Sequence, residues 1–221
     1  HKNPIFLISL LMNVIHKLAI FFINFFVKLI LLNKKVLSVI NNKINADIKF
    51  IKVKDSKLSF INSNHITNYR ITNFFMKEPE TLEWIDSFEE NKIFWDIGAN
   101  IGSYSLYAGL TKNIQIICFE PSYVNLDLLS KNIRLNKLNN KISIFPIPLS
   151  NISSSVEFKI SDITPGSALS SITSYDQNGK PINEMHSFNT FSTSSDDLID
   201  LFNLPQPDYI KIDVDGIEHL I

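Results

Sequence analysis

The stretch Trp95-Asp96-Ile97-Gly98-Ala99-Asn100-Ile101-Gly102 decides the fold of this 221-residue chain. It reads as a short apolar strand that ends in an acidic residue and turns through two glycines into a helix predicted over 103–110. Gly98 lets the backbone approach a ligand closely, and N–H groups at the helix start can receive an anion. The spacing is Gly-x-x-x-Gly and departs from the Gly-x-Gly-x-x-Gly of dinucleotide-binding enzymes. The turn therefore favours a small ligand other than a dinucleotide.

Strands and helices alternate regularly on both sides of this turn. Apolar strands are predicted at 93–97, 114–120, 142–147 and 208–214. Helices are predicted at 80–90, 103–110, 122–136 and 196–202. Strand–helix–strand units at this spacing form right-handed crossovers in a parallel sheet, and such a sheet binds ligands at the carboxyl ends of its strands. The predicted fold class is therefore α/β.

Two other regions have a different character. Residues 46–77 are expected to hold short strands that lead into the main domain, because 48–53 and 57–61 alternate partly in period two. Residues 150–195 are rich in Ser and Thr, with a strand predicted at 156–160 and turns at Pro165-Gly166 and Asn178-Gly179. A loop of this length within a compact domain is usually a binding element or partly mobile.

Acidic residues mark the ends of two more predicted strands. Glu120 ends the second strand, where a carboxylate can hold a pair of ribose hydroxyls, although it could also cap the helix that follows. Asp213 lies near the tip of the fourth strand, where a carboxylate can orient a substrate hydroxyl or take its proton. Asp213, Asp215 and Glu218 could together hold Mg²⁺ or Mn²⁺. For Asp215 and Glu218 we favour a structural role, as caps of the next helix. In the structural alternative for this cluster, Lys211 neutralises a buried acid.

The N-terminal segment, residues 1–45, is predicted to be a hydrophobic and basic helical region. Residues 5–32 are almost wholly apolar, and on a helix most of their polar residues form one stripe: Asn13, Lys17, Asn24 and Lys28. A membrane span would place Lys17 near the bilayer centre, at a cost of about 2.5–3.5 kcal/mol. A helix lying in the membrane surface suits the stripe better, with Lys34, Lys35 and Lys43 facing anionic headgroups. Burial against the rest of the protein or a second copy is the alternative.

Composition and charge narrow the functional classes. The chain is 45% hydrophobic and 19% charged, which excludes disorder as a description of the whole. Cys118 is the only cysteine, so there is no intramolecular disulfide or thiolate zinc site, and a reducing compartment is expected. Residues 1–60 hold ten lysines and two acidic residues, whereas the remainder holds 11 basic and 20 acidic residues. The acidic main domain argues against nucleic-acid binding.

These motifs together resemble the FkbM family of S-adenosylmethionine-dependent methyltransferases over about residues 70–221. The matching stretches occur in the family's order: Glu78–Trp84, Phe94–Gly102 with Tyr104 and Ser105, Phe119–Pro121 with Asn125, Leu129, Asn132 and Asn136, Asp196–Leu198, and Ile210–Glu218. The resemblance implies a Rossmann-like class I methyltransferase fold over 78–221, with helices on both faces of a seven-stranded sheet. The last strands of that sheet are absent, so we expect a fragment that is incomplete at its C-terminus.

The resemblance also implies S-adenosylmethionine as cofactor and O-methylation of a sugar, glycan or natural-product hydroxyl. Carried over by position, the methionine end of the cofactor would contact Asp96, Gly98, Asn100 and Gly102, and Glu120 would hold the ribose. Asp213 would face the transferring methyl and is the candidate general base, with His186 and His219 as other titratable candidates. Because their loop follows the third strand, the residues expected to line the acceptor pocket are Ser167, Ser170 and Ser171.

Two alternatives stay open from the sequence. The first is an NAD(P)-dependent oxidoreductase that shares the sheet and the ribose carboxylate. The second is an inactive membrane-associated scaffold that keeps the fold. The expected location is the cytoplasm, at the inner face of the membrane if residues 5–35 make a peripheral contact there.

Overall fold

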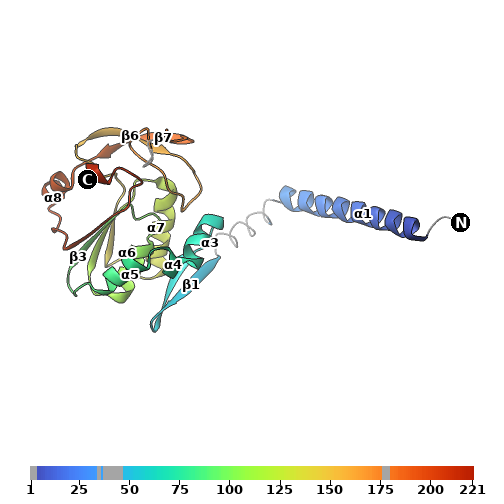
Figure 1. Cartoon of the computed structure of the whole chain (residues 1–221), viewed down its shortest axis with the longest axis horizontal. Helices are drawn as coiled ribbons and strands as arrows, with labels where there is room; N and C mark the ends of the chain where they lie inside the picture. The colour runs from blue at the N-terminus through green and yellow to red at the C-terminus, as the bar shows by residue number, and fades with distance from the viewer. Residues whose placement is uncertain (1–3, 34–35, 37–46, 176–179) are drawn as a thin grey trace. The chain divides into compact units, whose positions relative to one another are not determined.

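The computed structural model describes residues 4–33, 36, 47–175 and 180–221, and it divides into two units, residues 1–46 and 47–221 (Figure 1). The predicted turn at Asn178-Gly179 and the lysines Lys34, Lys35 and Lys43 lie outside the described residues.

The first unit contains one long helix, α1 (Pro4–Leu32). Pro4 is its first residue, where the fixed φ of proline suits a helix start, and no glycine interrupts it. Several of its large apolar side chains are exposed, including Phe21, Phe22, Phe25 and Phe26. Within the described residues, no helix combines the length and the apolar character that crossing a membrane requires.

The second unit is built on a parallel sheet of four strands in the order β5-β4-β3-β8. These strands are β3 (Ile93–Ile97), β4 (Gln115–Phe119), β5 (Ile142–Phe145) and β8 (Tyr209–Ile212). The prediction of a parallel α/β sheet is confirmed, although β4, β5 and β8 are each shorter than predicted. They are shorter because the residues that follow them, including Glu120 and Asp213, leave the sheet and enter loops at its carboxyl edge.

Helices cover both faces of this sheet, as Figure 1 shows. They are α5 (Pro79–Asp86), α6 (Ser103–Thr111), α7 (Tyr123–Leu135) and α8 (Ser195–Phe202). Side chains of β3 alternate between two buried clusters: Phe94 packs with Leu106 of α6 and Leu129 of α7, whereas Trp95 packs with Leu198 of α8. A strand buried on both faces needs this continuous apolar sequence.

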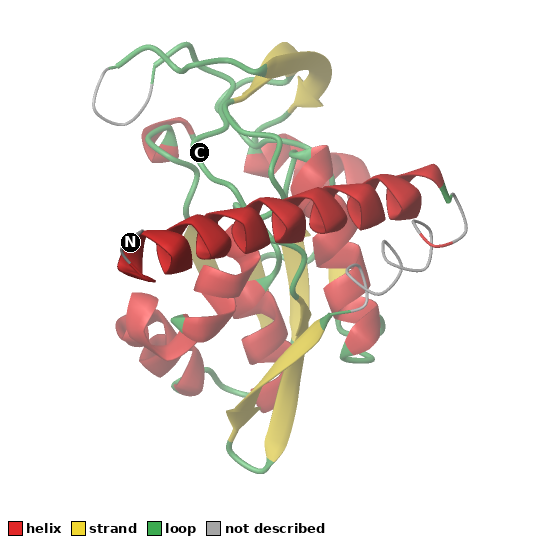
Figure 2. Ribbon diagram, turned by 90° about the vertical axis from the view of Figure 1, so that its right-hand side faces the viewer, coloured by secondary structure: helices red, strands yellow, loops and turns green. Residues whose placement is uncertain are grey.

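The region before the sheet differs in part from the prediction. Strands β1 (Ile48–Val53) and β2 (Ser56–Ile61) form the expected antiparallel hairpin, which Figure 2 shows as a long twisted ribbon. The prediction of further strands was wrong beyond this hairpin, because α3 (His65–Thr72) and α4 (Phe74–Lys77) follow. Asn64 begins α3 by a capping box: its side chain accepts hydrogen bonds from the N–H groups of Ile66 and Thr67, and Thr67 bonds back to Asn64 N–H.

The Ser- and Thr-rich region contains a second antiparallel pair. Strand β6 (Ser154–Ile160) confirms the strand predicted there, and it pairs with β7 (His186–Ser192). Strand β7 was not predicted from the sequence, because His, Ser, Asn and Thr interrupt the apolar signal that marks a strand. A single turn of 3₁₀ helix, η1 (Glu218–Leu220), follows β8.

Candidate cofactor-binding site

A cavity opens at the carboxyl ends of β3, β4, β5 and β8, where the sequence predicted a ligand site. It encloses about 560 Å³ of space outside the atoms, its open mouth included. The predicted site residues that line it are Gly98, Asn100, Glu120, Asp213, Ser167 and Ser170. Asp96, Gly102 and Ser171 are not among its lining residues. Ser171 instead exchanges backbone hydrogen bonds with Lys159.

The two glycines of the turn after β3 lie close against other parts of the domain. Gly98 has φ +81°, and a Cβ there would lie 2.0 Å from the Asp213 carbonyl oxygen. Gly102 has φ +88°, and a Cβ there would lie 2.6 Å from a methyl group of Leu129 on α7. In the structure, Gly98 therefore allows the backbone that follows β8 to approach the turn closely.

The amide groups of this turn are committed within the protein. Gly98 N–H and Ala99 N–H both donate to the Phe119 carbonyl, at 2.9 and 3.1 Å. Ile101 N–H donates to Asn100 Oδ1 at 2.9 Å, and Gly102 N–H donates to the Ala99 carbonyl at 2.8 Å. These hydrogen bonds fix the turn against the end of β4. Residues 98–102 therefore do not present the cluster of unpaired N–H groups that an anion would need.

Glu120 joins the turn to the next helix. Its Oε2 accepts a 2.7 Å hydrogen bond from Asn100 N–H, and its Oε1 accepts a 2.9 Å hydrogen bond from Ser122 N–H. Burial raises the pKa of the Glu120 carboxyl to about 7, although the N–H donors favour its ionised form. Glu120 therefore does hold the backbone before α7, as the structural alternative proposed. Each carboxylate oxygen keeps a further lone pair with which to accept a ligand hydroxyl.

Asp96 lies beneath the turn and is only 1% exposed. Its Oδ2 accepts a hydrogen bond from Ser105 on α6, and its Oδ1 lies 3.9 Å from Lys211 Nζ. Burial raises the pKa of Asp96, and the positive charge of Lys211 opposes that shift. In this structure Asp96 is the partner in a buried ion pair and does not form part of the cavity wall.

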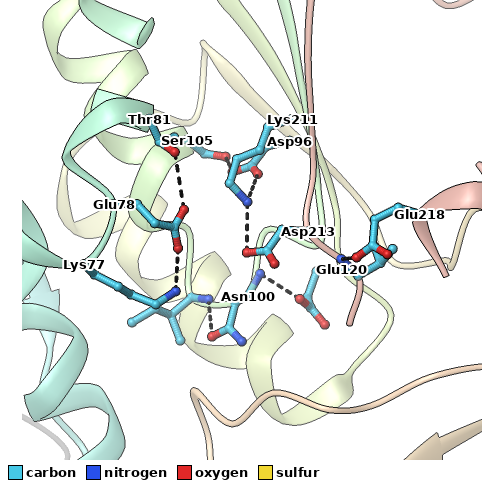
Figure 3. A network of polar contacts seen from close by, with 12 residues as sticks. Lys77, Glu78, Thr81, Asp96, Asn100, Ser105, Glu120, Lys211, Asp213 and Glu218 are labelled. Carbon is cyan, nitrogen blue, oxygen red and sulfur yellow. Dashed lines mark hydrogen bonds and ion pairs between the residues drawn. The ribbon is translucent and has the colours of Figure 1, made fainter. Parts of the chain in front are cut away.

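Lys211 and Asp213 form a second ion pair at the end of β8 (Figure 3). Lys211 Nζ lies 3.1 Å from Asp213 Oδ2, and it also lies 5.0 Å from the centre of the Tyr104 ring. The Lys211 side chain is 10% exposed and that of Asp213 is 50% exposed. Lys211 therefore lies in the interior, whereas its partner Asp213 lies in the wall of the cavity. Lys211 therefore neutralises a buried acid, as the structural alternative for this cluster predicted, and also holds Asp213 at the cavity.

The remaining acidic residues of the cluster take different partners. Asp215 lines the cavity and accepts a 2.6 Å hydrogen bond from Leu169 N–H, so our preference for a helix cap was wrong at this residue. Glu218 is the first residue of η1, and its Oε1 accepts from Gly216 N–H at 3.1 Å, so it holds the turn before η1; η1 itself has no side-chain cap. Among the described residues, no group of three or more His, Cys, Asp or Glu side chains is arranged to hold a metal ion. His186 and His219 are not lining residues of the cavity.

Asn125 is one of the residues that match the FkbM family, but no role was predicted for it; the structure places it in the wall of the cavity on α7. Its side chain is buried, and its Oδ1 accepts a 2.8 Å hydrogen bond from Gly166 N–H. Asparagine in the first turn of an amphipathic helix resembles an ordinary surface residue. Only the position of the distant Gly166 explains why it is buried here.

The fold and the cavity define the class of protein: a Rossmann-like domain with a cavity at the glycine turn after its first parallel strand and a carboxylate at the end of the second. Residues 96–221, more than half of the chain, match the family model described as the methyltransferase FkbM domain. The chain belongs to the FkbM methyltransferase family. This membership sets aside the NAD(P)-dependent oxidoreductase alternative.

Comparison with individual proteins gives more distant similarities. The chain is 25% identical over 134 residues to a hexuronic acid methyltransferase of Haloferax volcanii, covering 61% of this chain and 50% of that protein. The chain thus spans about half the length of this curated relative. Pyrococcus horikoshii TYW2, solved with MeSAdo, is 18% identical with a TM-score of 0.34, over 48% of this chain and 39% of that chain. A SAM-dependent methyltransferase of Agrobacterium tumefaciens is 12% identical with a TM-score of 0.35, over 46% and 32%.

Proposed function

We propose that this protein is an S-adenosylmethionine-dependent O-methyltransferase that acts on a hydroxyl group of a sugar, glycan or natural product. The observation that carries the proposal is the charge of the cavity in this FkbM domain. Glu120, Asp213 and Asp215 line it, and among the residues that the structure describes no lysine or arginine does. When bound, S-adenosylmethionine supplies a methyl group on a positively charged sulfur. A wall with three carboxylates and no cation fits such a ligand.

The proposed cofactor contacts follow from the residues at the cavity. Glu120 accepts the ribose hydroxyls, because its carboxylate is fixed by two N–H donors and still has free lone pairs. Gly98 and Asn100 form the wall at the methionine end. Asp96 and Gly102 act indirectly: Asp96 by its pairing with Lys211, and Gly102 by letting α7 pack against the turn.

Asp213 is the proposed general base. Its carboxylate is half exposed at the cavity and is held by Lys211 at 3.1 Å. From there it can orient an acceptor hydroxyl and take its proton, an effect typically worth about 10²–10⁴ in rate. Alignment of the two reactants can supply about 7–11 kcal/mol, so positioning is expected to contribute more than the base.

A sugar acceptor is supported by the name of the Haloferax relative, a hexuronic acid methyltransferase. The cavity favours a hydroxyl over a carboxylate as the group that is methylated. An acceptor carboxylate would come close to Glu120, Asp213 and Asp215 without a lining cation to pair with it, and such an arrangement of like charges is unfavourable.

A methyl-transfer assay tests this proposal. Radiolabelled S-adenosylmethionine is supplied with methyl hexosides and with methyl glucuronide, and the labelled product is analysed for methyl ether or methyl ester. We expect ether formation that falls by about 10²–10⁴ in Asp213→Asn. The matched control, Asp200→Asn on the exposed face of α8, should leave the rate unchanged. Methyl ester as the product would overturn the hydroxyl assignment, and an unchanged rate in Asp213→Asn would overturn the base.

We also propose that α1 lies on a membrane surface. The large apolar side chains exposed along it include Phe21 at 63% and Phe26 at 58%. Lys17 and Lys28, both exposed, lie on its polar stripe and would face anionic headgroups. Flotation of the full chain with vesicles tests the contact. Binding to phosphatidylglycerol vesicles should exceed binding to phosphatidylcholine vesicles and should fall in Phe21→Ser/Phe26→Ser. Equal recovery of this variant and the wild type with both vesicles would reject the contact.

A further inference from the structure

The segment 165–169 forms part of the cavity wall, and five side chains from four parts of the chain hold its backbone. The bonds are Asn64 Nδ2 to the Pro165 carbonyl at 2.9 Å, Arg70 Nε to the Gly166 carbonyl at 2.7 Å, Asn100 Nδ2 to the Ser167 carbonyl at 2.8 Å, Gly166 N–H to Asn125 Oδ1 at 2.8 Å, and Leu169 N–H to Asp215 Oδ2 at 2.6 Å. A loop that is merely a surface connection has no need of such anchoring. The segment is thus a built wall of the site.

Asn125 has the central position among these anchors. Its side chain is only 4% exposed, and it contacts two successive residues of the segment. Oδ1 accepts from Gly166 N–H at 2.8 Å, and Nδ2 donates to the Ser167 carbonyl at 3.3 Å. The Asn125 amide also favours the ionised form of Glu120, whose pKa it lowers. An amide has two N–H donors and one carbonyl acceptor, so the segment takes one donor and the acceptor, and one donor remains.

The backbone of Gly166 explains why the segment fits so closely at this point. Gly166 has φ +89°, and a Cβ there would lie 3.2 Å from the methyl group of Thr67 on α3. The segment is therefore confined between α3 and the amide of Asn125. Movement of the segment away from the cavity must break the Asn125 hydrogen bonds, and movement of Asn125 takes away an amide that favours ionised Glu120.

We propose that Asn125 is a positioning residue that couples Glu120 to the segment 165–169, so that a cofactor held by Glu120 and an ordered cavity wall stabilise each other. This inference rests on the proposed function only in taking S-adenosylmethionine as the ligand of Glu120. The coupling itself exists in the protein without ligand, because all its hydrogen bonds are made between protein groups. Either Glu120 or the segment 165–169 can therefore be perturbed by itself while the effect on the other is measured.

Two substitutions separate positioning from packing. Asn125→Asp has nearly the same shape and can still accept from Gly166 N–H, but it has no N–H donors and adds a negative charge beside Glu120. Asn125→Ala removes the side chain. If Asn125 only filled space, the aspartate would behave as wild type. If it acts through its donors, both variants lose function, and the control Asp127→Asn on the exposed side of the same helix does not.

The first measurement is hydrogen exchange of the full chain, with and without S-adenosylhomocysteine. In wild type, we expect the ligand to slow exchange in peptides covering 161–171. In Asn125→Ala and Asn125→Asp, exchange there should be at least about tenfold faster without ligand. Peptides covering 48–61 serve as an internal control for global unfolding. If an Asn125 variant does not fold, Arg70→Met, which removes an anchor outside the cavity wall, should accelerate exchange of the same peptides by a smaller factor.

The second measurement is the pH dependence of S-adenosylmethionine affinity by calorimetry. Loss of the Asn125 amide removes a group that lowers the pKa of Glu120, so the pH at which affinity is half-maximal should move upward in both variants. A purely structural role would lower affinity equally at every pH. Wild-type exchange at 161–171 in both variants, or an unmoved pH midpoint, would overturn the coupling. Failure of wild type to bind either ligand would instead overturn the proposed function, and the exchange of the ligand-free protein would still test the anchoring.

Discussion

Asp96 and Lys211 are directly paired residues on neighbouring parallel strands, and their charged groups lie 3.9 Å apart inside the protein. Asp96 belongs to β3 and Lys211 to β8, so the contact joins the strand of the glycine turn to the strand that carries Asp213. Asp96 is 1% exposed, and its Oδ1 has no hydrogen-bond partner among the described residues. Lys211 is therefore the main compensation for a charge that burial disfavours.

Replacing Lys211 by Met should destabilise the protein by about 3–5 kcal/mol, because it leaves a buried carboxylate without its counter-charge. Urea unfolding measures the loss. The double variant Lys211→Met/Asp96→Asn should recover much of it, since the amide carries no charge.

A matched control is Lys131→Met, which removes the exposed pair with Asp127 on α7 and should cost roughly 0–1 kcal/mol. Equal losses in Lys211→Met and Lys131→Met would contradict the importance of burial for the Asp96 pair.

The buried Glu120 makes stability depend on pH. Its pKa is raised from an ordinary 4.5 to about 7 in the folded protein. An acid with a raised pKa binds its proton more tightly when folded, so its contribution is fully present below about pH 4.5 and is lost as pH rises through 7. The loss is on the order of 3 kcal/mol. Thermal unfolding from pH 4.5 to 8 should show this decline, and Glu120→Gln should flatten it.

The same carboxyl predicts the opposite trend for cofactor binding. Ribose hydroxyls donate hydrogen bonds to a carboxylate, so affinity for S-adenosylmethionine should rise as pH increases through about 7. Calorimetry at constant ionic strength measures it. Affinity that falls over this interval, or a rise that persists in Glu120→Gln, would show that Glu120 does not hold the ribose.

Gly98→Ala should abolish cofactor binding and destabilise the protein by at least about 2 kcal/mol. The added Cβ would lie 2.0 Å from the Asp213 carbonyl, and φ at this residue is +81°. Such a backbone conformation alone costs about 1–3 kcal/mol for a non-glycine residue. Gly109→Ala on α6 is the comparison, because its Cβ would approach no atom closer than 3.3 Å. Similar unfolding midpoints for the two variants would contradict this geometry.

Two substitutions of Asn64 should separate its two roles, the cap of α3 and the anchor of the cavity wall. Asn64→Ala removes the cap of α3 and should cost about 1–2 kcal/mol. Asn64→Asp keeps the capping acceptor but loses the donor to the Pro165 carbonyl, so its unfolding midpoint should stay near wild type. Faster hydrogen exchange at 161–171 in Asn64→Asp would confirm that the donor anchors the cavity wall. A midpoint as low as that of Asn64→Ala would reject the separation.

The sequence predicted the sheet and the cavity well, because apolar periodicity and glycine position are local signals. Strand β3 was predicted with its observed bounds, and α6 and α7 were predicted to within one residue at each end. Glu120 and Asp213 lie at strand tips, and parallel strands bring their tips together whatever the loops do. Gly98, Asn100, Glu120 and Asp213 therefore meet at one cavity, as expected.

Residues whose roles depend on distant partners could not be predicted in the same way. Asp96 was predicted to contact the cofactor. In the structure its carboxylate forms a buried ion pair with Lys211, which is 115 positions away in the sequence. The contacts of Asn125 and Asp215 with 166–169 depend on the path of an irregular segment, which has no periodicity. Helix α3 was missed because its capping signal at Asn64 and Thr67 precedes a polar helix with little apolar pattern.

Calorimetric titration of S-adenosylmethionine, and separately of NADH, into the full chain tests the central claim most directly. We expect saturable binding of S-adenosylmethionine, at least about tenfold weaker in Glu120→Ala and unchanged in Asp127→Asn, with no binding of NADH. The absence of S-adenosylmethionine binding by a folded sample, verified by its cooperative unfolding, would contradict the assignment of this cavity as a methyltransferase cofactor site.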